Sequence, residues 1–207
     1  MNEHIEHLKE IRSMMERSSK FLSLSGLSGV SAGIVALVSA FLVYSKKVEI
    51  TGNTDPKGIL QAYPADQNFK YYLLQIAVVT LLVALVFGVY FTIRKAKKQN
   101  VSVWNNLSKK LLLHLAVPLL AGGVFSVGLV FHGYIWIAFP ASLIFYALAL
   151  VNASTFTVRD VYFLGIFEVI LGLISMFFTG YTLLFWAFGF GVLHILYGAI
   201  MYFKYEK

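Results

Sequence analysis

Residues 71–93 read YYLLQIAVVTLLVALVFGVYFTI, without a single charged side chain. About 18 apolar residues are enough for a helix to cross the hydrocarbon core of a bilayer, which is roughly 30 Å thick. Comparable runs fill most of the chain, at 21–44, 71–93, 111–131, 134–151, 161–179 and 182–203. The sequence therefore predicts an all-α integral membrane protein, a bundle of six transmembrane helices.

The composition supports a membrane protein. Hydrophobic residues make up 58% of the 207 residues and charged residues only 13%. The absence of cysteine excludes disulfides, thiolate metal sites and cysteine nucleophiles. The net charge of +7 comes from lysines and arginines that flank the apolar runs, so we expect no nucleic-acid partner.

Basic residues are unequally divided between the two sides of the expected bundle. Thirteen lie in the N-terminal segment, the loop 94–110, the turn at Arg159 and the C-terminus, against four on the other side. The positive-inside rule then predicts that both termini are cytoplasmic, in a multi-pass protein of a cell membrane. We expect a bacterial inner membrane.

The six-helix domain is expected to span residues 21–207, preceded by a cytoplasmic amphipathic helix at residues 1–20. Two interpretations of this first helix stay open: it lies on the membrane surface, or it packs on the protein's own loops. Residues 45–69 form the expected external loop. Residues 94–110 form a basic cytoplasmic loop suited to anionic lipid headgroups.

Small residues recur every fourth position at the start of the first span, at Ser25, Gly29 and Gly33. Such spacing allows two helix backbones to approach closely, and we expect a helix-packing face. A polar path lined by serine, or a lipid-headgroup site, is the alternative interpretation.

Glu168 is the only acidic residue deep inside a predicted span. A buried charge is costly in lipid, so such a residue normally faces the bundle interior and a partner. His194 lies at nearly the same distance from the tight turn near Gly180, and the two helices must be neighbours, so we expect the pair to meet. Glycines flank both residues, and we expect them to be helix-packing positions that make room for the pair: Gly165, Gly172, Gly191 and Gly198.

A carboxylate beside an imidazole inside lipid can carry a proton, bind a cation or hold a polar ligand. The alternative is a hydrogen bond that merely holds two helices together. A second polar level is expected nearer the cytoplasm, where His114 and Asn152 lie equally far from the turn between the third and fourth spans.

No catalytic signature is present. The chain lacks a zinc-hydrolase motif, a phosphate-binding loop and a retinal lysine within a span, and we expect no enzyme activity, metal or cofactor. Two hypotheses remain. The first is a non-catalytic sensor, scaffold or subunit whose polar pocket binds an ion, small ligand or lipid. The second is a small proton-coupled transporter or channel that uses Glu168. Expected partners are membrane lipids and a protein partner or second copy.

Overall fold

The computed structural model describes residues 25–52, 54 and 67–207. Among these residues the structure is all-helical, without strands, and six stretches are long and apolar enough to cross a membrane, as predicted. The first five stretches are built on α2 (Gly26–Thr51), α3 (Gln67–Lys98), α4 (Asn106–Phe131), α5 (Ile135–Ala153) and α6 (Arg159–Phe177). The sixth joins α7 (Thr182–Trp186), the π-helix η4 (Ala187–Leu193) and α8 (His194–Tyr205).

The helices extend beyond the apolar runs. α3 continues to Lys98, so most of the predicted basic loop is helical and only 99–105 lie outside the helices. Three lysines in the last turn of α3 favour this extension, because cations stabilise a helix C-terminus. α4 begins with a capping box, in which Ser108 donates its N–H to the Asn105 side chain. Hydropathy marks only the lipid-embedded part of a helix, which explains the short predicted boundaries.

The expected amphipathic helix at 1–20 and most of the external loop 45–69 lie outside the described residues. The first of these two segments was predicted to be helical, and the structure leaves that prediction untested. α2 itself continues past the predicted boundary at residue 44, to Thr51, and ends at Gly52 in the left-handed conformation that favours glycine.

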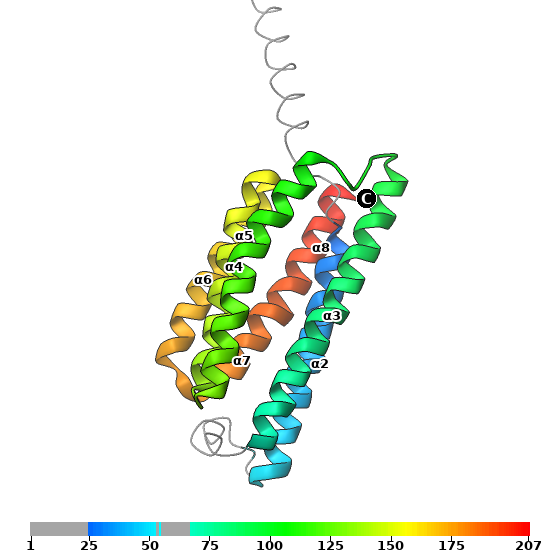
Figure 1. Ribbon diagram of the computed structural model, residues 1–207. Helices are drawn as coiled ribbons and strands as arrows, with labels where there is room; N and C mark the ends of the chain where they lie inside the picture. The colour runs from blue at the N-terminus through cyan, green and yellow to red at the C-terminus, as the bar shows by residue number, and fades with distance from the viewer. Residues whose placement is uncertain (1–24, 53, 55–66) are drawn as a thin grey trace, which may run out of the picture.

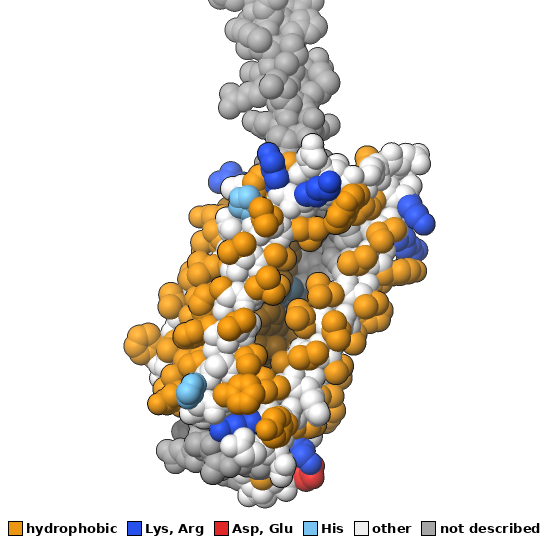
Figure 2. All heavy atoms as spheres, viewed as in Figure 1, with side chains coloured by type: hydrophobic (Ala, Val, Ile, Leu, Met, Phe, Trp, Pro, Cys, Tyr) orange, Lys and Arg blue, Asp and Glu red, His pale blue; other side chains and the backbone are white. Residues whose placement is uncertain are grey.

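The spans form two groups (Figure 1). In the first group α2 packs along both α3 and the last span, and in the second group α5 packs along both α4 and α6. Consecutive helices α3 and α4 scarcely touch. Figure 2 shows the surface between them as a hollow with hydrophobic walls, and shows lysines and arginines gathered at the two ends of the molecule.

Two apolar clusters close the seam between these groups. One, toward the end where α4 turns into α5, joins Phe69 and Leu73 of the first group to Phe139 of the second. The other, toward the opposite end, joins Leu150 and Leu164 of the second group to Met201 of the first. Burial of these side chains stabilises the assembly of the two groups through dispersion and close packing.

Glycines set the distance between α2 and the last span. A Cβ on Gly29 would lie 3.0 Å from the Cα of Gly198, and one on Gly33 would lie 2.6 Å from the carbonyl oxygen of Gly191. Hence Gly29 and Gly33 lie in a close helix–helix contact of the kind expected from their spacing. Ser25 does not: its hydroxyl donates to the Glu206 carboxylate at 3.1 Å, across the end of the bundle.

The remaining four glycines lie in close helix contacts, as a helix-packing role requires, but these contacts are not between α6 and α8 around the Glu168–His194 pair. Gly165 and Gly172 pack against α5, where added Cβ atoms would meet the backbone of Ala147 and the side chain of Ile144. Gly191 and Gly198 pack against α2. The glycines of α6 and those of the last span have the same spacing, but they serve two different contacts. α6 packs most closely on α5, and the last span packs most closely on α2.

Candidate functional site

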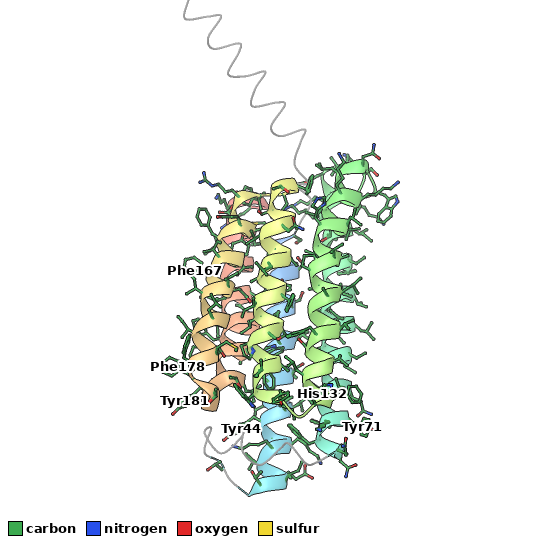
Figure 3. The ribbon with its side chains drawn as sticks, turned by 60° about the vertical axis from the view of Figure 1, so that its left-hand side comes forward. Tyr44, Tyr71, His132, Phe167, Phe178 and Tyr181 are labelled. Carbon is green, nitrogen blue, oxygen red and sulfur yellow. The ribbon has the colours of Figure 1, made fainter. Side chains whose placement is uncertain are left out.

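Glu168 lies midway along α6 and points into the bundle. Its neighbour Phe167 is 60% exposed and projects outward in Figure 3. Successive residues of a helix are about 100° apart, so Glu168 is turned inward and is 0% exposed. The carboxylate is thus removed from both water and lipid, as a functional or structural residue in a span should be.

His194 meets Glu168 across the seam between the two helix groups. Its Nδ1 lies 3.2 Å from Glu168 Oε1, and the imidazole is almost fully buried. The pairing follows from the tight turn at 178–181, which returns the chain antiparallel to α6. Equal distances from that turn place both residues at the same depth, as the sequence predicted.

Tyr146 of α5 is the third member of the site. Its Oη lies 2.7 Å from His194 Nε2, and the two rings are 5.3 Å apart. Phe190 packs on both, with ring centroids 4.9 Å from Tyr146 and 5.9 Å from His194. We refer to Glu168, His194 and Tyr146 as the polar triad.

The hydrogen bonds of His194 determine its tautomer. Nδ1 lies 3.0 Å from the carbonyl oxygen of Gly189, and a carbonyl can only accept, so Nδ1 carries hydrogen and donates. In the neutral ring Nε2 then accepts from the Tyr146 hydroxyl. Both ring nitrogens are therefore satisfied without Glu168.

Glu168 is left without a hydrogen bond. Neither of its carboxyl oxygens accepts a hydrogen bond in the described part of the chain, although both are completely buried and Oε1 lies 3.2 Å from His194 Nδ1. Leaving such a group unsatisfied normally costs about 1–3 kcal/mol, and more if it is charged. A buried carboxyl without a hydrogen bond calls for an explanation, such as a bound proton, ion or water.

A π-helix supplies the carbonyl that holds His194. The segment Ala187–Leu193 immediately precedes His194, and its Gly189 has no side chain that would crowd the site. A Cβ there would lie 2.6 Å from Leu143 Cδ2 and 3.4 Å from Glu168 Oε2. π-Helical segments often mark functional sites, because they shift the residues that follow around the helix axis.

The second predicted polar level does not form a buried pair. Asn152 Nδ2 donates to the backbone oxygen of His114 at 2.8 Å, while the His114 ring contacts the Lys110 carbonyl and Phe156. Asn152 is exposed. The two residues are close, as expected, but this contact is a helix-to-helix link at the edge of the bundle rather than a polar cavity.

A separate cluster ties α6 to α8 at the end of the bundle. Asp160 accepts hydrogen bonds from Lys204 at 3.0 Å and from the Tyr205 hydroxyl at 2.5 Å. Lys204 and Tyr205 of α8 thus contact α6 near its start, whereas His194 contacts α6 at Glu168, midway along it. The cluster is partly exposed and fully paired, so it needs no ligand.

Sequence reasoning found two members of the polar triad and missed Tyr146 and Gly189. Tyr146 sits in an apolar span with several other aromatic residues, and nothing local distinguishes it. Gly189 lies five residues before His194, which is a visible spacing in the sequence. Its carbonyl is the acceptor for His194 Nδ1 in a stretch that is π-helical, and the sequence does not predict that helix type. Among the described residues no three His, Cys, Asp or Glu side chains gather as a metal site would require.

Comparison with known families gives one match. Residues 68–113 match a family model described as a domain of unknown function (DUF4083). The matched segment covers most of α3, the loop that follows it and the start of α4, well under half of the chain. No curated protein and no solved structure matches the chain. The six candidate spans indicate a multi-pass membrane protein.

Proposed function

We propose that this protein is a non-catalytic membrane protein whose polar triad binds a proton, or the hydrogen-bond donor of a small polar ligand, at Glu168. One observation carries the proposal: neither oxygen of the buried Glu168 carboxyl accepts a hydrogen bond from the described residues, although His194 Nδ1 lies 3.2 Å from Oε1. His194 itself is satisfied by Tyr146 and Gly189. A residue that served only to hold helices together would use its hydrogen-bonding capacity on the neighbouring helix.

A proton is the simplest occupant. A protonated carboxyl is neutral, which removes the cost of a buried charge, and its O–H supplies a donor. His194 stands 3.2 Å away and links Glu168 to the partly exposed Tyr146. The triad therefore forms a short chain of groups that can each give and take a proton. We place the protein in a bacterial inner membrane, with both termini in the cytoplasm.

The test compares Glu168→Gln with Glu49→Gln, a control carboxylate that is exposed and paired with Lys46. Infrared spectra between about pH 5 and pH 9 detect the C=O stretch of a protonated carboxyl. We expect this band in the wild type and in Glu49→Gln, and its loss in Glu168→Gln. We also expect Glu168→Gln to change the free energy of unfolding by less than about 1 kcal/mol.

Two results would contradict a bound proton at Glu168. One is the absence of any band from a protonated Glu168. The other is a loss of about 3–5 kcal/mol in Glu168→Gln, as occurs when one partner of a buried ion pair is removed. Both results together would make the Glu168–His194 contact a structural ion pair, with neither a proton nor a ligand at Glu168.

A second candidate function is proton-coupled transport. The position of the polar triad between the two helix groups favours this function. Tyr146 and Glu168 belong to one group and His194 to the other. An apolar cluster closes the contact between the groups toward each end of the bundle. Relative movement of two helix groups around a central site is a common transport geometry. Proteoliposomes with an imposed pH gradient test it. Transport predicts proton flux that Glu168→Gln abolishes and Glu49→Gln preserves.

A further inference from the structure

Of the six candidate spans in the described part of the chain, α3 has the lowest buried share. It lies at the edge of the bundle beside α2 (Figure 1) and makes almost no contact with α4. None of the residues in its most hydrophobic 18-residue window is buried. Lipid can cover such a helix, provided that the exposed side chains are apolar.

A regular stripe of exposed residues runs along the side of α3 that faces away from α2. Its members are separated by alternating steps of four and three residues, the spacing of a coiled-coil seam. All are exposed, and we call them the Gln75 stripe: Gln75, Val79, Leu82, Val86, Val89 and Ile93. The opposite side of α3 carries the residues that pack on α2, including Thr80, which hydrogen-bonds to Ser39 at 2.6 Å.

Gln75 is the exception in an otherwise apolar stripe. Its side chain is exposed and forms no hydrogen bond or ion pair with any residue that the structure describes. It lies five residues along α3 from Lys70, which donates to the Phe131 carbonyl at the end of α4. At about 1.5 Å per residue, Gln75 is therefore roughly 7.5 Å further along the span than Lys70. Hydrocarbon offers its amide no partner.

We propose that a second copy of this chain covers the Gln75 stripe and pairs Gln75 with its counterpart. Two copies in one membrane share the same orientation, so a twofold axis between them must run along the membrane normal. Residues at equal depth then meet, and Gln75 faces the Gln75 of the other copy. A carboxamide both donates and accepts, so two such groups can form two reciprocal hydrogen bonds.

The apolar members of the stripe complete the contact. Their spacing of 3.5 residues on average predicts a left-handed crossing of about 20° between the two copies of α3. The single polar position fixes the register, as a buried amide does in coiled coils. This inference does not rest on the function proposed for Glu168, which lies on another helix.

Cysteine cross-linking in membranes tests the interface, and the chain has no cysteine to interfere. Val79→Cys and Val86→Cys should form disulfide-linked dimers on oxidation. Leu81→Cys is the matched control, because Leu81 lies only two residues, about 3 Å, along the same helix from Val79 and is similarly exposed, but is off the stripe. Equal cross-linking at Val79 and Leu81, or none at either stripe position, would overturn the proposal.

Substitution of Gln75 tests the polar pair. We expect Gln75→Leu to weaken dimerisation roughly threefold to tenfold, as for loss of an interhelical hydrogen bond. Gln75→Asn, which keeps an amide, should retain part of the dimerisation affinity. Energy transfer between labelled copies in nanodiscs measures both, and an unchanged dimer in Gln75→Leu would refute the pairing. If that variant fails to insert, the cysteine comparison decides alone.

Discussion

Gly198→Ala should destabilise the protein, although alanine is the better helix former. The added Cβ would lie 2.5 Å from both the Gly26 carbonyl oxygen and the Val30 nitrogen. Ordinary van der Waals contact begins at 3.4 Å, so the two helices must separate by roughly 0.9 Å. Both obstacles are backbone atoms, and no side-chain rotation can relieve the contact.

The size of the effect follows from two opposing contributions. Overpacking of this kind lowers the free energy of unfolding by about 1–3 kcal/mol. The higher helix propensity of alanine over glycine raises it by up to about 1 kcal/mol. We therefore expect the free energy of unfolding to fall by about 1–2 kcal/mol. A gap of 0.5–1 Å between helices also weakens dispersion along the whole contact, which raises the cost if the separation spreads.

Gly123→Ala on α4 is the matched control, because its Cβ would meet nothing within 4 Å. It should leave the free energy of unfolding unchanged or raise it by up to about 1 kcal/mol. Reversible unfolding of the purified variants in detergent measures both. If Gly198→Ala is as stable as Gly123→Ala, the close contact between α2 and α8 does not limit stability and the reasoning is wrong.

Three further substitutions probe the polar contacts. Tyr146→Phe removes the donor to His194 Nε2 and should lower the free energy of unfolding by about 1–3 kcal/mol in the same unfolding assay, whereas an unaltered value would mean that water replaces the hydroxyl. Glu206→Gln weakens the acceptor for the Ser25 hydroxyl and the first N–H of α2, and we expect a loss of about 0.5–2 kcal/mol that shrinks in high salt. Asn152→Ala removes one exposed hydrogen bond to the His114 carbonyl and should change stability by no more than about 0.5 kcal/mol, so a larger loss would restore the second polar level to the site.

The six spans could be predicted from the sequence because the signal is local. A run such as residues 71–93 must be helical in lipid, where each backbone group has to be satisfied within its own segment. The meeting of Glu168 and His194 was also predictable. A tight turn makes consecutive spans antiparallel neighbours, and a fixed rise per residue then sets their depths.

Only the tertiary structure decided how each helix is rotated and which neighbour it meets. Gly165 and Gly191 lie three residues before Glu168 and His194, respectively, in the sequence. In the structure Gly165 packs on α5 and Gly191 on α2, because the packing of the whole bundle determines which helix each face contacts. The same holds for Tyr146, which reaches His194 from a helix far away in sequence. Gln75 is an ordinary polar residue in the sequence. Only the tertiary structure shows that α2 packs on the opposite side of α3 and leaves the Gln75 amide exposed.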